Sequence, residues 1–206
     1  IIGAKGRYPN INNSSLINYN GMTLIQRALE TANISRFLSD IVVSSDHIDT
    51  LTHCESLEND GCVPKHLRLL RRRGRTKTGE IPIFEIVSEA IDALFEFKQE
   101  MPDIVLFMSQ HTVNISPKHL EAALDTLVVS RKDSLLSVTE IDNILLRQIT
   151  DGLEIINPGK LTSIEKERDR FFLYNGAIAC FWKEILDKQN GFGEIAYLEM
   201  TKEEGY

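Results

Sequence analysis

Short unbroken apolar runs recur along this chain and predict buried strands. They lie at residues 41–43, 104–108, 135–138 and 177–181. Such runs are typical of parallel strands that helices cover on both faces, whereas a strand with one wet face alternates between apolar and polar residues. We therefore expect these segments to lie in one sheet.

Helix-type patterns separate these runs. Apolar residues recur every three to four positions at residues 24–32, 84–95 and 120–128. Ser116 suits the N-cap of the third helix, and Pro117 suits its first turn. The alternation of strands and helices predicts an α/β fold with a Rossmann-like, mainly parallel sheet sandwiched by helices.

The ends of the predicted strands indicate where a ligand would bind. In open parallel sheets, ligands lie beyond the carboxyl ends of the strands, so the loops after Ile2, Val43 and Met108 are the expected place for a site. Residues 139–174 are less regular than the rest. We expect a single domain over residues 1–206, from which residues 139–174 protrude as an arm.

The composition excludes several classes of protein. With 206 residues, 42% of them hydrophobic, the chain can bury a sizeable core without disulfides. The net charge of -7 argues against a protein that coats nucleic acid. The three cysteines lack metal-ligand spacing and are expected to be reduced. No apolar run approaches the roughly 18 residues of a membrane span, and no signal peptide is evident, so we expect a cytoplasmic protein without a membrane partner.

A local basic cluster departs from this acidic background. It comprises Arg68, Arg71, Arg72, Arg73, Arg75 and Lys77. Three interpretations are open: a solvated loop, a site for a phosphorylated small molecule, or a nucleic-acid patch. The acidic remainder of the chain disfavours the last.

The opening segment is a second place where a phosphate could bind. A short strand runs into Gly3-Ala4-Lys5-Gly6-Arg7, where glycines allow backbone N–H groups to approach a phosphate and the cations neutralise it. The segment has neither the Walker A pattern nor the dinucleotide-binding fingerprint. A phosphate loop and a plain turn both remain possible.

Seven short motifs follow one another along nearly the whole chain. They are Ala4-Lys5-Gly6, residues 19–25, Val43-Ser44-Ser45-Asp46, Arg71-Arg72, Ser137-Val138-Thr139-Glu140, Asn175-Gly176-Ala177-Ile178 and residues 196–200. In this order they resemble the motifs of the CMP-sugar synthetases, the acylneuraminate cytidylyltransferase-like family. The resemblance implies a single nucleotidyltransferase-like domain.

The resemblance also implies an activity and a set of site residues. The expected reaction transfers CMP from CTP to an acidic keto sugar, a sialic-acid-like nonulosonate, in carbohydrate biosynthesis, with release of pyrophosphate and with Mg²⁺ as the cofactor. Lys5 is the implied catalytic residue, and Gln110 and Asn175 are the implied sugar-binding residues. The implied nucleotide-binding residues are Ala4, Lys5, Gly6, Arg7, Asp46, Arg71 and Arg72. The family's homodimer would use an arm such as residues 139–174.

Several of these residues also have a structural interpretation. Asp46 can cap a helix or close a turn, and Asn175 can form a turn before a strand. The match at Gln110 requires one inserted residue, and without it Ser109 takes the glutamine's place. His111 fits a loop residue as well as a catalytic base.

Other positions depart from the family pattern. Tyr8-Pro9 and Ser14-Ser15 stand where the family has S-K and K-N pairs. The R-R-Q motif falls on residues 164–166, with Arg168 and Arg170 nearby. The aspartates expected to bind Mg²⁺ would lie beyond Tyr206, so the metal ligands are unknown. Two alternatives follow: a diverged, non-catalytic member that binds a nucleotide or a protein partner, and a KDO-type or other sugar nucleotidyltransferase.

Overall fold

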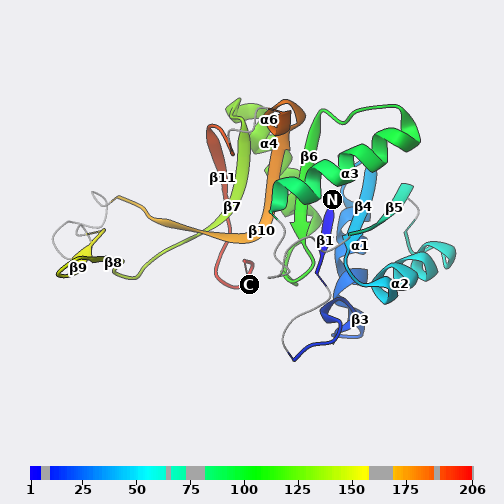
Figure 1. The fold of residues 1–206 in the computed structure, drawn as a ribbon, viewed down its shortest axis with the longest axis horizontal. Coiled ribbons are helices and arrows are strands. Elements are labelled where there is room, and N and C mark those ends of the chain that lie inside the picture. The colour runs from blue at the N-terminus through cyan, green and yellow to red at the C-terminus, as the bar shows by residue number, and fades with distance from the viewer. Residues whose placement is uncertain (6–9, 64–65, 73–81, 158–168, 188–190, 206) are drawn as a thin grey trace.

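The computed structural model describes residues 1–5, 10–63, 66–72, 82–157, 169–187 and 191–205. In these ranges the chain forms a seven-stranded sheet with the order β11-β7-β10-β6-β1-β4-β5 (Figure 1). Its strands are β1 (Ile2–Ala4), β4 (Asp40–Ser45), β5 (His66–Arg71), β6 (Ile104–Ser109), β7 (Ser134–Glu140), β10 (Phe172–Trp182) and β11 (Ile195–Glu199). All neighbouring pairs are parallel except those of β10, which runs antiparallel to β6 and β7. The expectation of a mainly parallel sheet is confirmed.

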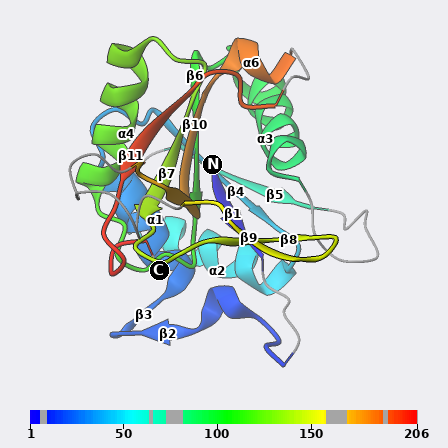
Figure 2. The ribbon, with the colours of Figure 1, turned by 90° about the vertical axis from the view of Figure 1, so that its left-hand side faces the viewer.

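Helices cover the sheet on both faces (Figure 2). One face packs against α1 (Leu24–Ile34), α2 (Ile48–Asn59) and α4 (Pro117–Ser130), whose buried residues share one core cluster with the strands. The other face packs against α3 (Ile83–Lys98) and α6 (Lys183–Asp187). The sandwich predicted from the sequence is therefore present.

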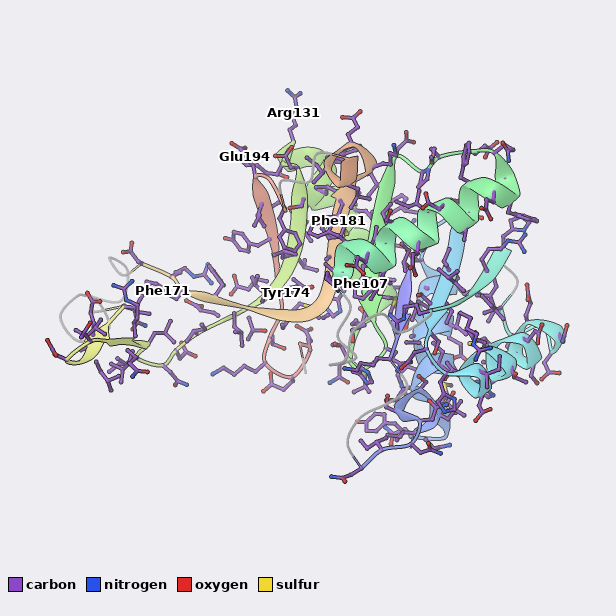
Figure 3. The ribbon with its side chains drawn as sticks, viewed as in Figure 1. Phe107, Arg131, Phe171, Tyr174, Phe181 and Glu194 are labelled. Atoms are coloured by element: carbon purple, nitrogen blue, oxygen red, sulfur yellow. The ribbon has the colours of Figure 1, made fainter. Side chains whose placement is uncertain are left out.

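The alternation of side chains along β6 and β10 explains why these runs are apolar throughout. In β6, Leu106 and Met108 join the cluster with α1, α2 and α4, whereas Val105 and Phe107 face α3. In β10, Phe181 lies on the α3 side with its ring centroid 5.3 Å from that of Phe84 (Figure 3). Within residues 104–108 and 177–181 both faces of these strands pack against helices, so neither face has polar positions there.

Most strands of the main sheet and most long helices were predictable from local patterns, but α2, β5 and β11 were not. The four apolar runs lie within β4, β6, β7 and β10, and the three helical patterns lie within α1, α3 and α4, so these predictions are confirmed. Helix α2 was missed because polar residues interrupt its apolar side. Strand β5 was read as part of a basic loop, and β11 carried no assigned structure.

Residues 143–157, which follow β7, extend away from the sheet (Figure 1). They contain an antiparallel hairpin formed by β8 (Leu146–Ile149) and β9 (Gly152–Ile155). The side chain of Asn157 closes the base of this hairpin, because its Oδ1 accepts from the N–H of Leu145 at 2.7 Å and its Nδ2 donates to the carbonyl of Asn143 at 2.9 Å. We call residues 143–157 the hairpin arm.

Smaller elements surround the opening segment. A 3-10 turn, η1 (Ser14–Leu16), follows the opening, and β2 (Asn18–Tyr19) pairs with β3 (Met22–Thr23) before α1 begins. The Oγ1 of Thr23 accepts from the N–H of Gln26 at 3.2 Å and caps α1. No helix in the described ranges combines the length and apolar character needed to cross a membrane.

Candidate functional site

The carboxyl ends of β1, β4, β5 and β6 meet at one edge of the sheet. The strand register brings these ends together. Ala4 lies opposite Ser45, Ser45 lies opposite Arg71, and Gly3 lies opposite Ser109. Lys5, Asp46, Arg72 and Gln110 directly follow these four strands. The structure thus places Lys5, Asp46 and Arg72, which the resemblance assigns to a nucleotide, at the same edge as Gln110, which it assigns to the sugar. We call this region the carboxyl edge.

Arg72 is buried at the carboxyl edge and is used inside the protein. Its side chain is 5% exposed, its Nη2 donates to the carbonyl oxygen of Ala4 at 3.2 Å, and it lies 4.0 Å from Oδ1 of Asp46. Its N–H also donates to the carbonyl of Ser45 at 2.8 Å. Arg72 therefore ties the ends of β1, β4 and β5 together.

The solvated-loop interpretation of the basic cluster is wrong for the residues that the structure describes. Arg68 and Arg71 lie on strand β5, and the Arg68 guanidinium stacks 3.1 Å from the ring centroid of Phe97 on α3. Arg71 is exposed at the end of the strand. The other members of the cluster, Arg73, Arg75 and Lys77, lie outside the described residues.

Gln110 lies in the interior of the site rather than on its surface. It is 2% exposed, and its Nε2 donates to the carbonyl oxygen of Lys5 at 3.3 Å and to Oγ of Ser15 at 2.8 Å. Its Oε1 has no hydrogen-bond partner among the described residues. The amide therefore joins β6 to the opening segment.

The turn at η1 completes this connection. Ser14 and Ser15 are buried, and Oγ of Ser14 donates to the Lys5 carbonyl at 2.6 Å. Oδ1 of Asn13 accepts from the N–H of Ser15 at 3.1 Å and from Oγ1 of Thr50 on α2 at 3.2 Å. These serines were noted only as departures from a lysine-asparagine pair. No local pattern in the sequence predicts that Ser14 contacts the Lys5 carbonyl or that Ser15 contacts Gln110.

His111 lies beside Lys5 at the end of β6. Its N–H donates to Oγ of Ser109 at 3.2 Å, and a matching turn at the end of β4 joins the N–H of His47 to Oγ of Ser45 at 3.2 Å. Burial lowers the pKa of the His111 imidazole below its ordinary value, and the Lys5 ammonium lowers it further. At neutral pH the ring is therefore neutral.

Asn175 lies across the sheet, on β10, where it holds a turn. Its Oδ1 accepts from Oγ of Ser137 at 2.6 Å and from the N–H of Ala177 at 3.1 Å, and its Nδ2 donates to Oγ1 of Thr139 at 3.2 Å. Gly176 follows with φ of 73°, a conformation that favours glycine. The sequence analysis allowed Asn175 to be a turn residue or a sugar contact, and these contacts give it the role of a turn residue.

Arg170 joins the ends of β7, β10 and β11. Its guanidinium contacts both carboxylate oxygens of Glu140 at 3.0 Å and one of Glu199 at 2.7 Å. These residues end β7 and β11, whereas Arg170 precedes β10. Arg170 was considered as a substitute for an arginine of the R-R-Q motif, and here it is paired with two carboxylates.

Gly6, Arg7 and Arg168 lie outside the described residues. Within the described ranges, no group of three or more His, Cys, Asp or Glu side chains could hold a metal ion.

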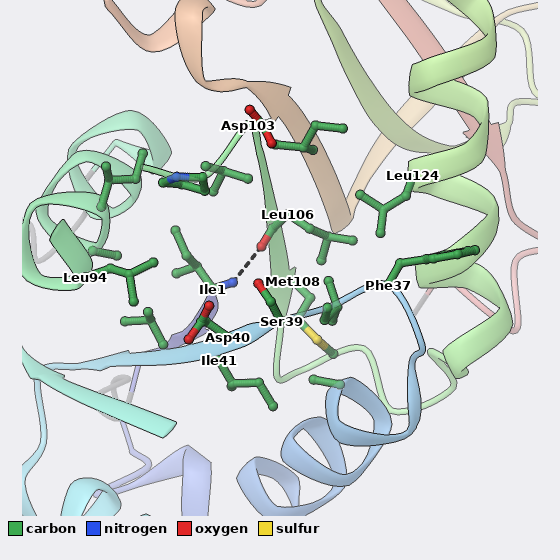
Figure 4. A pocket seen from close by; sticks show the side chains of 18 of the residues that line it. Ile1, Phe37, Ser39, Asp40, Ile41, Leu94, Asp103, Leu106, Met108 and Leu124 are labelled. Atoms are coloured by element: carbon green, nitrogen blue, oxygen red, sulfur yellow. Dashed lines mark hydrogen bonds between the residues drawn. The ribbon is translucent and has the colours of Figure 1, made fainter. Parts of the chain in front are cut away.

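A cavity of about 530 Å³ lies at the opposite end of the sheet, where β4 and β6 begin (Figure 4). Its lining is mainly apolar and includes Ile41, Leu94 and Leu124, and Asp40 pairs with Lys98 beside it. None of the predicted site residues lines this cavity. Its size alone does not make it the functional site, because the polar residues gather at the carboxyl edge.

The sequence matches no family model and no curated protein. The fold is similar to that of solved structures. A CMP:2-keto-3-deoxy-manno-octonic acid synthetase complexed with CTP has a TM-score of 0.64 and 12% identity over 97% of this chain and 88% of that chain. The 4-diphosphocytidyl-2C-methyl-D-erythritol synthase from Anaerococcus prevotii has a TM-score of 0.66 and 10% identity over 98% of this chain and 86% of that chain.

A cytidylyltransferase from Leptospira borgpetersenii has a TM-score of 0.52 and 15% identity, and the match covers 91% of this chain and 60% of that chain. At these identities the likeness establishes the fold alone. The names of all three proteins refer to the chemistry of cytidine nucleotides.

Proposed function

We propose that this protein is a cytidylyltransferase that uses CTP. A hydroxyl of the acceptor attacks the α-phosphate and gives up its proton to water. A new phosphorus–oxygen bond forms, the bond to the β-phosphate breaks, and pyrophosphate leaves. The observation that carries the proposal is the meeting of Lys5, Asp46, Arg71 and Arg72 at the carboxyl edge. The shared fold of the three cytidine-nucleotide proteins supports it.

Lys5 is the proposed catalytic residue. It follows β1 directly, where its ammonium can neutralise charge that develops on the phosphates. Arg71, exposed at the end of β5, is a second cation available to the nucleotide. Arg72 would act on the nucleotide indirectly, because its guanidinium is bound to Ala4 and lies beside Asp46.

The proposed acceptor is an acidic keto sugar of the sialic-acid-like nonulosonate class. The resemblance of the motifs around Thr139 and Asn175 supports this class, and Thr139 on β7 contacts Asn175 on β10. A KDO-type acceptor is the alternative, and the fold shared with the octonic acid synthetase is compatible with it. Both acceptors carry a carboxylate, so they share the chemistry that a basic or amide-lined site would recognise.

The described residues do not by themselves form a magnesium site. Proteins hold Mg²⁺ through one or two carboxylates together with substrate phosphates. Asp46 is a carboxylate at the carboxyl edge, but it lies beside Arg72, and no cluster of potential ligands surrounds it in the described ranges. Magnesium dependence is therefore a prediction from the resemblance alone.

A non-catalytic nucleotide-binding protein is the second candidate. The observation that favours it is the burial of Ser14 and Ser15, which stand where the family has a lysine and an asparagine. Their hydroxyls contact the Lys5 carbonyl and Gln110, so they present no charge to a phosphate.

We also propose that two copies of the chain associate through the hairpin arm. Leu146, Leu153 and Ile155 are exposed on both strands of the hairpin. An isolated two-stranded hairpin is only marginally stable in water, so a partner that covers these side chains would stabilise it. Location in the cytoplasm remains a prediction from composition.

The decisive experiment is calorimetric titration of the protein with CTP, UTP and GTP, each with and without Mg²⁺. Selective CTP binding followed by release of pyrophosphate with a sialic acid or KDO supports the enzyme and identifies the acceptor. Selective CTP binding without turnover on any acidic keto sugar favours the non-catalytic candidate. Equal or undetectable binding of all three nucleotides refutes the proposed function.

A further inference from the structure

Gln110 has the features of a residue that positions another residue. Its amide is almost completely buried, at 2% exposure, directly after β6. It donates two hydrogen bonds, one to the Lys5 carbonyl of the opening segment at 3.3 Å and one to the Ser15 hydroxyl of the η1 turn at 2.8 Å. A side chain this enclosed is poorly placed to contact a sugar that enters from solvent.

The Lys5 carbonyl receives two side-chain donors. One is Nε2 of Gln110, and the other is Oγ of Ser14 at 2.6 Å. Two donors from different elements restrain the carbonyl more than one donor does, because a rotation that satisfies one bond breaks the other. The direction in which the Lys5 side chain leaves the backbone is restrained with it.

Burial of the Gln110 amide destabilises the packed interior. Its Oε1 has no partner among the described residues, and a buried polar atom without a partner destabilises the folded state. Methionine has a similar shape and would fill the space without that cost. The amide is therefore explained by its two donated hydrogen bonds rather than by packing.

We propose that Gln110 is a positioning residue that holds the backbone of Lys5 in the orientation in which its ammonium meets the triphosphate. This role rests on the proposed use of CTP, and it replaces the direct sugar contact that the family resemblance implies. Ser15 takes part in the same positioning, because its hydroxyl on the η1 turn accepts a hydrogen bond from the Gln110 amide.

The test compares steady-state kinetics of the wild type and Gln110→Met, with CTP and the acceptor varied separately. Loss of two hydrogen bonds at the Lys5 backbone is expected to raise the KM for CTP roughly tenfold. The KM for the acceptor should stay within about twofold of the wild-type value. A rise in the acceptor KM with an unchanged KM for CTP would overturn the proposal and restore the sugar contact.

Two further variants make the test specific. Ser15→Ala removes the second acceptor of the Gln110 amide, and the double variant should be little worse than Gln110→Met alone, since both act through one contact. Gln99→Met changes an exposed glutamine at the end of α3 and should leave both KM values unchanged. Additive effects of the two site variants would count against a shared positioning role.

A separate readout covers the case in which the wild type does not bind CTP, so that the proposed function itself fails. Amide hydrogen exchange at Ser15 and Ile17, which are hydrogen-bonded within the Asn13–Ile17 turn, reports on η1, which Ser14 links to the Lys5 carbonyl. Faster exchange in Gln110→Met at an unchanged unfolding midpoint supports the positioning role. Unchanged exchange overturns it.

Discussion

The Nη2 atom of Arg72 donates a hydrogen bond to the carbonyl oxygen of Ala4 at 3.2 Å, which links the ends of two strands that are not neighbours. Ala4 ends β1 and Arg72 follows β5, and β4 lies between them. The arginine reaches over the end of β4, where it also lies 4.0 Å from Asp46. One buried side chain thus fixes the entrance to the opening segment.

Replacement of this arginine should destabilise the protein. Arg72→Met is expected to lower the free energy of unfolding by about 1 to 3 kcal/mol, because the Ala4 carbonyl loses its buried donor and Asp46 loses a neighbouring cation. The free energy of unfolding of Arg72→Lys should lie between those of the wild type and Arg72→Met, since lysine keeps the charge but lacks the planar guanidinium group. Denaturant unfolding measures each difference.

The neighbouring arginine provides the matched control. Arg71 is exposed, so Arg71→Met should change the free energy of unfolding by no more than about 0.5 kcal/mol. Equal losses in the Arg71 and Arg72 variants would contradict the buried link.

Lys5 should control nucleotide affinity. A charge-assisted contact from its ammonium to the triphosphate predicts that Lys5→Met weakens CTP binding roughly 10- to 100-fold. Isothermal titration with CTP measures this loss. Lys132→Met is the matched control, since Lys132 lies before β7 at the opposite end of the sheet. Unchanged affinity in Lys5→Met would remove Lys5 from the site.

His111 should make stability depend on pH. Burial, and then Lys5, hold the pKa of the folded imidazole below its ordinary value of 6.5. As the pH falls through 6.5, the unfolded chain takes up a proton before the folded protein does, so the free energy of unfolding decreases until the pH passes the folded pKa. Above that window the imidazole is neutral in both states and contributes no slope.

Unfolding midpoints between pH 8 and pH 5 (a range that spans roughly the ordinary titration of histidine) test this expectation. The wild type should lose more stability than His111→Gln as the pH falls. Lys5→Met should lose less than the wild type, because removal of the ammonium raises the folded pKa toward its ordinary value. Parallel curves for the wild type and His111→Gln would refute the assignment.

The hairpin arm should decide the state of association. Leu153 is 65% exposed at the hairpin. At micromolar protein concentration the wild type is expected to be a dimer and Leu153→Lys a monomer, because the charged side chain would oppose burial of this surface. Light scattering gives the mass of each species. Val129→Lys is the control, since Val129 is 81% exposed on α4 rather than on the hairpin arm. A wild type that is already monomeric at this concentration would contradict association through the arm.

Particular residues mark the limit of prediction from the sequence. The resemblance grouped Asp46, Arg71 and Arg72 with Lys5, and the structure places all four at one edge of the sheet. The sequence did not separate the buried Arg72 from the exposed Arg71, because adjacent residues carry the same charge and only the tertiary contacts of Arg72 with Ala4 and Asp46 distinguish them. Strand β5 was itself hidden by its cations, which are tolerated at the edge of the sheet where β5 lies.

The sequence by itself determined the order of the main strands and helices and the two-sided covering of the sheet. These properties depend on the spacing of apolar residues within single segments, which is local and visible in the chain. The tertiary structure alone decided that β10 runs antiparallel, that Gln110 faces Ser15, and that Asn175 holds a turn against Thr139. Such contacts join residues far apart in the sequence, and they form only when packing and strand register bring those residues together.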